Sequence, residues 1–315
     1  MMSPQVTVPE MEKPADKSAR PSVYKDLIVL VKARMGLLAA IIALAGYYMG
    51  STGPVSGLGM FHVFMGTWIV CAGAFLLNMY VERDVDALME RTSSRPLPAG
   101  RANANTVFFW GVVVSVIGVA YLGFSTNLLA AASGALALAG YVMVYTPLKR
   151  VTTLNTIVGS FPGAMPPIIG WAAAADEIAV GAVIMFMILF MWQIPHFLAL
   201  AWMYRNEYRE AGFVMISHDD PQGTFTTRQN LIYAIVYVLI TLLPLPFGLA
   251  GYWYTAVAAV SGVYFLWLCL QWFAHRDRKY AVHVFIATLF HVPLLYGAMV
   301  LDKGAVLAMV PEHLL

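Results

Sequence analysis

The chain has 315 residues and a mean hydropathy of +0.71, with 60% hydrophobic and only 11% charged residues. Soluble globular domains carry about 25% charged residues, so this composition excludes that class and indicates a protein that crosses a membrane repeatedly. The net charge of +2 is small, but the charges are unevenly distributed along the chain.

Residues 1–24 are polar and contain four prolines. They lack the apolar core of a secretory signal and the acid-poor, arginine-rich composition of a mitochondrial transit peptide, so we expect a disordered cytoplasmic tail in a bacterial protein. Apolar stretches long enough to cross about 30 Å of hydrocarbon then follow, at 27–49, 58–80, 105–124, 127–146, 153–173, 177–204, 229–249, 252–273 and 283–301. The stretches are too long for strands and lack alternation with a period of two. The predicted fold class is therefore all-α: one intramembrane domain over 25–302, with a short extracytoplasmic tail at 303–315.

The basic residues indicate the orientation of these predicted helices. With a cytoplasmic N-terminus and nine spans, 18 of the 19 lysines and arginines lie on the cytoplasmic side, and only Lys303 lies outside. This distribution follows the positive-inside rule and supports a multi-pass protein of the bacterial inner membrane. The large polar connections lie on the same side, so we expect a central cavity that opens toward the cytoplasm.

The second predicted helix ends in a cluster of oxygen-bearing side chains. Asn78, Glu82 and Asp86 are spaced at i, i+4 and i+8, which on a helix is a drift of only about 80° around the axis. Hard oxygen ligands on one face suit Mg²⁺, which commonly carries a diphosphate. The alternative is a solvated charged loop between two membrane helices.

Arginines 91, 95 and 101 follow this acidic cluster closely. Guanidinium groups and a metal ion together stabilise a diphosphate as a leaving group. The alternative for any single arginine is that it serves only membrane orientation, because cytoplasmic loops are generally enriched in arginine.

Four stretches in order resemble one known family, the UbiA-type intramembrane prenyltransferases, and more narrowly its haem-farnesylating branch. They are the spaced residues from Asn78 to Gly100, the segment Tyr145–Arg150 with Asn155, the segment Gly163–Trp171, and the segment Trp192–Phe197. The resemblance covers about residues 25–300.

The resemblance implies a nine-helix bundle and a Mg²⁺-dependent prenyltransferase. The implied reaction transfers the farnesyl group of farnesyl diphosphate to a vinyl group of haem b, with addition of water, and gives haem O and diphosphate. Asn78, Glu82 and Asp86 take the metal and catalytic roles of the first signature, and haem b is a substrate rather than a prosthetic group. The second acidic signature is poorly kept, with only Glu207 and Glu210 available. The candidate substrate-binding residues are Arg34, Arg91, Arg95, Lys149, Arg150 and Glu207.

His196 is a further catalytic candidate, because a histidine inside a membrane helix beside Pro195 is expensive and commonly functional. It would ligate the haem iron, bind a propionate or position the attacking water; a plain hydrogen bond to a neighbouring helix is the alternative. Lys32 and Arg34 either snorkel to the headgroups or face the cavity.

Two other functions stay open at this point. One is a prenyltransferase for a quinone precursor or a chlorophyllide, and the other is a membrane transporter, although transporters place their polar groups near the bilayer midplane. The expected partners are the lipid bilayer, farnesyl diphosphate and haem b. A haem A-forming enzyme or terminal oxidase assembly factors are candidate protein partners, and no nucleic acid is expected.

Overall fold

The computed structural model describes residues 23–309, so the predicted tail at 1–24 lies almost wholly outside the described residues. Within this range the chain is helical and contains no strand. In chain order the elements are α1 (Val23–Leu30), α2 (Ala33–Gly50), α3 (Gly57–Asp86), α4 (Glu90–Ser93), α5 (Ala104–Ser125), α6 (Leu128–Ala139), the π-helix η1 (Gly140–Tyr145), α7 (Thr146–Leu148), α8 (Asn155–Gly163), α9 (Pro166–Ala175), α10 (Val180–Met203), α11 (Arg205–Glu210), α12 (Thr224–Thr241), α13 (Tyr252–His275) and α14 (Arg278–Met309).

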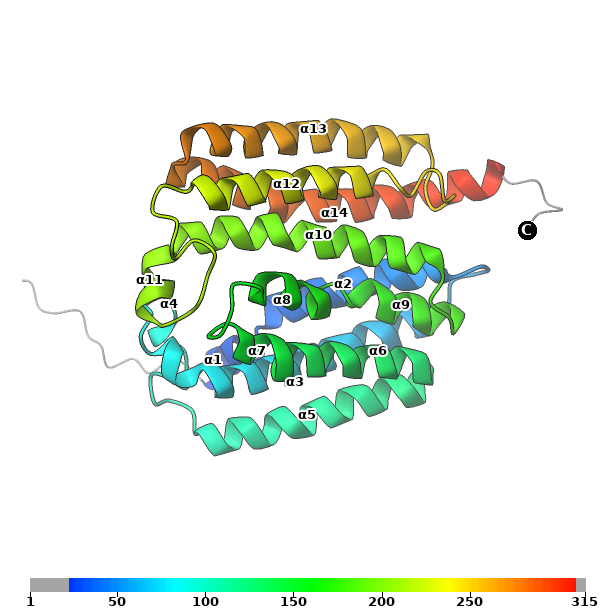
Figure 1. Ribbon diagram of the computed structural model, residues 1–315. Coiled ribbons are helices and arrows are strands. Elements are labelled where there is room, and N and C mark those ends of the chain that lie inside the picture. Colours follow the sequence, from blue (N-terminus) through cyan, green and yellow to red (C-terminus); the bar gives the residue numbers. More distant parts are fainter. Residues whose placement is uncertain (1–22, 310–315) are drawn as a thin grey trace, which may run out of the picture.

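The long helices lie side by side in one bundle (Figure 1). Among the described residues, eight helical stretches are long and apolar enough to cross a membrane, with α6 through α7 and α8 through α9 each counting as one. The helix α12 is a ninth of 18 residues, and it runs alongside the others but begins with polar residues that lower its hydropathy. The prediction of a multi-pass all-α bundle is confirmed.

Several predicted spans differ from the observed helices in their ends or are interrupted. The stretch 27–49 is two helices, because Lys32 adopts a left-handed conformation (φ 43°) between α1 and α2. The stretch 153–173 is broken near Ala164, because Pro166 and Pro167 have no N–H to continue a helix. The stretch 229–249 is wrong at both ends: α12 starts at Thr224 and ends at Thr241.

The helix α14 is also longer than predicted and continues to Met309, through the start of the predicted tail at 303. Near this end Asp302 accepts hydrogen bonds from the first N–H groups of α13, at Gly251 and Tyr254. The neighbouring Lys303 donates to the last carbonyls of α2. Both contacts complement helix ends, where backbone groups lack partners within the helix.

Close packing between α2 and α9 depends on glycines. A Cβ atom at Gly170 would lie 1.8 Å from the carbonyl oxygen of Ala43, and one at Gly46 would lie 2.3 Å from that of Pro167. Small residues allow membrane helices to approach in this way.

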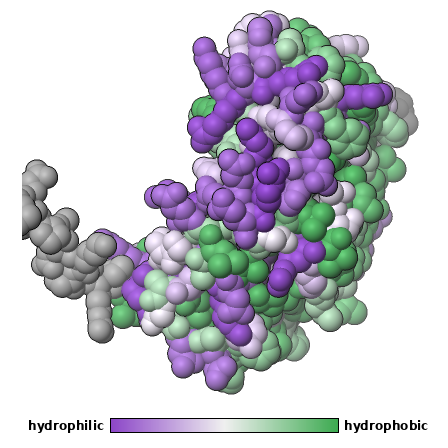
Figure 2. All heavy atoms as spheres, turned by 60° about the vertical axis from the view of Figure 1, so that its left-hand side comes forward, coloured by the Kyte–Doolittle hydropathy of each residue, from purple (hydrophilic) through white to green (hydrophobic). Residues whose placement is uncertain are grey.

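The short helices α1, α4 and α11 gather at one end of the bundle, the left end in Figure 1. Figure 2 shows that hydrophilic side chains cover this end, whereas the flanks are mainly hydrophobic. Contacts between distant segments join the connections there: Arg101 pairs with Asp26 of α1, and Arg276 donates to Thr224. We call this the polar end of the bundle.

Candidate active site

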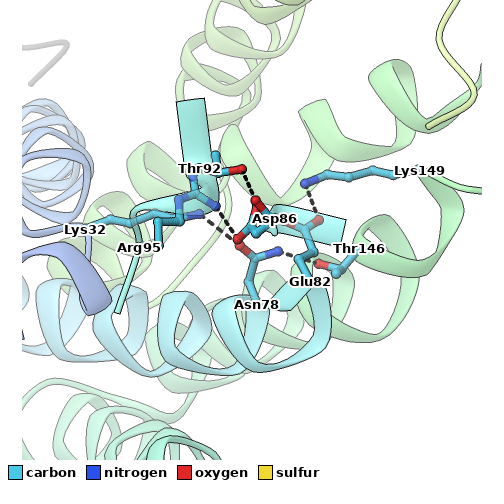
Figure 3. Close-up of polar contacts among 8 residues, drawn as sticks. All are labelled: Lys32, Asn78, Glu82, Asp86, Thr92, Arg95, Thr146 and Lys149. Carbon is cyan, nitrogen blue, oxygen red and sulfur yellow. Dashed lines mark hydrogen bonds and ion pairs between the residues drawn. The ribbon is translucent and has the colours of Figure 1, made fainter. Parts of the chain in front are cut away.

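The three residues of the acidic cluster lie together on α3, close to the polar end. Asn78, Glu82 and Asp86 are all buried, at 0%, 7% and 1% exposure. Figure 3 shows that the cluster lies among basic side chains contributed by other segments. The alternative of a solvated charged loop is therefore excluded for these three residues.

Each member of the cluster is bound by a different cation. Lys32 Nζ donates to Asn78 Oδ1 at 2.8 Å, and Lys149 Nζ donates to Glu82 Oε1 at 2.6 Å. Arg95 donates to Asp86 Oδ2 at 2.5 Å. In Figure 3 Lys149 approaches from the side opposite to Lys32 and Arg95. Charge-assisted bonds of this kind compensate the loss of hydration of the buried carboxylates.

Two threonines complete the polar contacts of the cluster. Thr146 accepts a hydrogen bond from Asn78 Nδ2 at 3.2 Å and donates its own proton to the carbonyl of Tyr141. Thr92 donates to the main-chain carbonyl of Asp86 at 2.8 Å. These contacts fix the amide of Asn78 with its nitrogen toward Thr146 and its oxygen toward Lys32, so that the oxygen can accept from a cation.

The segment that follows the π-helix η1 positions Lys149. Its ammonium group lies 4.5 Å from the ring centroid of Tyr145, and its carbonyl accepts a hydrogen bond from Val214 N at 2.8 Å. Asn155 donates to the carbonyl of Val214, so the loop after α11 is fastened over this segment. Burial opposes the charge of Lys149, but attraction by Glu82 outweighs it and raises the pKa of Lys149 above its ordinary value.

A cleft of about 370 Å³ lies beside Glu82. Arg150, which is exposed, lines this cleft together with Thr146 and Phe213. Arg150 and Glu82 therefore line the same cleft, and a role of Arg150 in substrate binding stays a prediction.

The predicted residues of the first and second signatures meet at the polar end. Glu207 of α11 accepts a hydrogen bond from the main-chain N–H of Arg91 in α4, at 3.4 Å. The guanidinium of Arg91 lies 5.3 Å from the ring centroid of Tyr204. The helix α11 is thus held against the segment that follows the acidic cluster.

Two expectations about basic residues change. Arg34 lies on the exposed side of α2 and is not brought to the cluster, whereas Lys32 is. Lys32 adopts a left-handed conformation just before α2 begins, whereas Arg34 lies within α2. Arg101 pairs with the exposed end of α1 instead of the cluster, and its hydrogen bond lowers the pKa of Asp26.

The donor set of the cluster fits Mg²⁺. Two carboxylates and an amide oxygen are hard ligands, and Mg²⁺ is commonly held by one or two carboxylates plus substrate phosphates. The described residues contain no group of three or more His, Cys, Asp and Glu side chains arranged to hold a metal by themselves. The arrangement therefore suits a metal that arrives with a phosphate ligand better than a closed all-protein site.

Comparison with known proteins gives the same family as the motifs. The sequence pattern described as "UbiA prenyltransferase family" matches residues 39–294. The chain belongs to this family. It is 38% identical to the protoheme IX farnesyltransferase of Solibacter usitatus over 288 residues, which covers 89% of this chain and 99% of the relative.

Solved structures share the fold of this chain. A digeranylgeranylglyceryl phosphate synthase superimposes with a TM-score of 0.75 at 16% identity, over 89% of this chain and 98% of that chain. A UbiA homolog from Archaeoglobus fulgidus, bound to DMAPP and Mg²⁺, gives a TM-score of 0.59 at 15% identity, over 90% of this chain and 100% of that one. As a member of this family the chain is a prenyltransferase. Its α3 cluster lies close to the polar end of the bundle.

Proposed function

We propose that this prenyltransferase transfers the farnesyl group of farnesyl diphosphate to a vinyl group of haem b in the presence of Mg²⁺. The observation that carries the proposal is the buried α3 cluster, in which three oxygen donors and three cations meet in a chain 38% identical to a protoheme IX farnesyltransferase. An A. fulgidus homolog of the same fold binds DMAPP and Mg²⁺, which supports a metal-bound prenyl diphosphate as the donor.

Asn78, Glu82 and Asp86 would hold the metal ion. When bound, the ion neutralises the diphosphate and favours cleavage of the allylic C–O bond, with the electron pair leaving on the phosphate oxygen. With the metal held by these oxygens, Lys32, Arg95 and Lys149, which bond the cluster in the free protein, would be available to donate to the phosphate oxygens. Their charges stabilise the leaving group in an interior where water does not compete.

Carbon–carbon bond formation needs no protein nucleophile. The π electrons of the haem vinyl group add to the farnesyl cation, and the resulting cation beside the pyrrole is captured by water, which then releases a proton. Aromatic rings near the cluster are placed to stabilise positive charge: Phe75 and Tyr145 lie next to Tyr141, at centroid distances of 5.8 and 5.6 Å.

We further propose that the polar end faces the cytoplasm of a bacterial inner membrane. The support is the distribution of the basic residues, which follows the positive-inside rule. Labelling of single cysteines in right-side-out and inverted vesicles tests this orientation: labelling of a polar-end cysteine only from the outside of right-side-out vesicles would overturn it.

The reaction is tested with the purified protein in lipid nanodiscs, supplied with farnesyl diphosphate, haem b and Mg²⁺. Mass spectrometry is expected to detect haem O. Prenylated hydroxybenzoate formed from an added quinone precursor, with no haem O, would show that the acceptor is wrong. Asp86→Ala is expected to abolish turnover while the protein still inserts and purifies; unchanged turnover would remove the metal assignment.

A further inference from the structure

His196 is held tightly in the interior of the bundle by uncharged groups. Its Nδ1 lies 2.8 Å from the hydroxyl of Thr288 in α14. Its ring stacks against Trp192 and Phe285, at centroid distances of 5.0 and 4.7 Å. Trp192 also donates to the main-chain carbonyl of Thr288, so two side chains of α10 are fixed to one residue of α14.

The contacts of Thr288 determine the tautomer of His196. The Thr288 hydroxyl has a single proton, which it donates to the main-chain carbonyl of Phe285. It must therefore accept from His196, whose proton lies on Nδ1. The Nε2 atom then carries a lone pair; it has no hydrogen-bond partner within the described part of the chain, and it is not sealed from solvent.

The position of His196 on α10 directs it toward the interior. Trp192 faces α14, and Gln193 faces α8 through its hydrogen bond to the carbonyl of Ser160. At 100° per residue His196 lies between these two, about 40° from Trp192 and about 60° from Gln193. This arc of α10 therefore lies between its contacts with α14 and with α8.

His196 also lies at nearly the same depth as the α3 cluster. The helices α3 and α10 both end at the polar end, where Glu207 contacts the main chain of Arg91. His196 precedes the end of α10 by seven residues, or about 10 Å, and Asn78 precedes the end of α3 by eight, or about 12 Å.

We propose that His196 binds the iron of the haem substrate through Nε2, with Thr288 as the positioning residue that keeps the proton on Nδ1. Metal-ligating histidines almost always donate their other ring N–H to a fixed acceptor, as His196 does. A propionate would need an N–H at Nε2, which this tautomer lacks. If His196 acted as a base toward water, it would become an imidazolium ion. The groups that hold its ring are uncharged, so a buried positive charge at this place would be costly.

This inference rests on the proposed function, since it needs haem as the acceptor. The test is haem b titration of the protein in nanodiscs, followed by absorption and by the iron–histidine stretching band in resonance Raman spectra of the ferrous state. His196→Gly is expected to lose the band, and added imidazole is expected to restore it. Thr288→Val is expected to weaken haem binding about 10- to 100-fold and to shift the band, whereas Thr288→Ser retains both.

His62→Gly is the matched control, because this histidine also bonds a hydroxyl, that of Tyr121, but lies near the opposite end of α3. It is expected to keep the wild-type spectrum. An unchanged band in His196→Gly would overturn the inference and leave the proposed reaction standing. The inference would also be overturned if His196→Gly bound haem normally and made a farnesylated product without the hydroxyl group. That result would show that His196 acts on the attacking water and not on the iron. A wild-type protein that neither binds nor farnesylates haem b would overturn the proposed function itself.

Discussion

The pairing of Lys149 with Glu82 can be tested by removing the cation alone. In Lys149→Met, Glu82 keeps its charge in a place that is only 7% exposed, with its partner at 2.6 Å gone. Breaking one side of a buried pair costs about 3–5 kcal/mol, because the remaining charge is left uncompensated. We expect the lower part of this range, about 3 kcal/mol, in metal-free protein, since Lys32 also lies close enough to attract Glu82.

In the proposed reaction Lys149 also donates to the leaving diphosphate, so we expect the same substitution to reduce kcat by about 100-fold or more. Thermal unfolding in the presence of EDTA and haem O formation by mass spectrometry measure the two effects. Lys149→Arg keeps the charge and should lose less of both. The double variant Lys149→Met with Glu82→Gln has no unpaired charge, so it should regain stability but remain inactive.

This double variant separates the structural effect from the catalytic one. If Lys149→Met unfolds with the wild-type midpoint and turns over within about twofold of the wild type, Lys149 neither compensates Glu82 nor assists the leaving group, and the reasoning is refuted.

Three further predictions concern packing, pH and metal. Gly170→Ala should destabilise the bundle by about 1–3 kcal/mol, because its Cβ would meet the carbonyl of Ala43; Gly297→Ala, which meets nothing within 4 Å, is the control in the same unfolding assay. The hydrogen bond from Arg101 lowers the pKa of Asp26, so the pair stabilises the fold above the ordinary aspartate pKa and loses this effect as pH falls through the lowered value. The unfolding midpoints of wild type and Asp26→Asn should thus differ slightly at neutral pH, by less than about 1 kcal/mol in free energy, and converge in acid; a difference that grows in acid would contradict the assignment. Chelation by EDTA should abolish haem O formation and Mg²⁺ should restore it, and undiminished turnover in EDTA would exclude a metal-bound diphosphate.

The sequence predicts the membrane helices well because their signal is local. Length and apolarity identify most of the spans, and a spacing of four residues places Asn78, Glu82 and Asp86 on one face of α3, where the structure has them. Helix boundaries are harder to predict, since they depend on packing. Pro195 lies inside α10 without ending it, whereas Pro166 begins a new helix.

The partners of the cluster could not be predicted in the same way, because each comes from a distant segment. Lys32 and Arg34 are equivalent by composition, and only the structure shows that Lys32 contacts Asn78 whereas Arg34 lies on the exposed side of α2. Thr288 carried no sequence signal at all. It lies 92 residues from His196, and its role follows only from the contact between α14 and α10.

The arrangement of charges explains how a buried site tolerates both the free and the bound state. In the free cluster each carboxylate has its own cation, Lys149 for Glu82 and Arg95 for Asp86. Lys32 adds a third basic group, whose pKa burial lowers to about 7, so a bound anion would favour its charged form. A metal diphosphate brings a cation for the carboxylates and an anion for the lysines and arginine, so every charge again finds a partner. The basic residues come from before α2, after α4 and after α7, so they link three segments to α3 in the free state. In the proposed reaction the same residues would contact the substrate. Neutralising one cation should therefore weaken both states, whereas neutralising a cation together with its acid should spare the fold and abolish only the reaction.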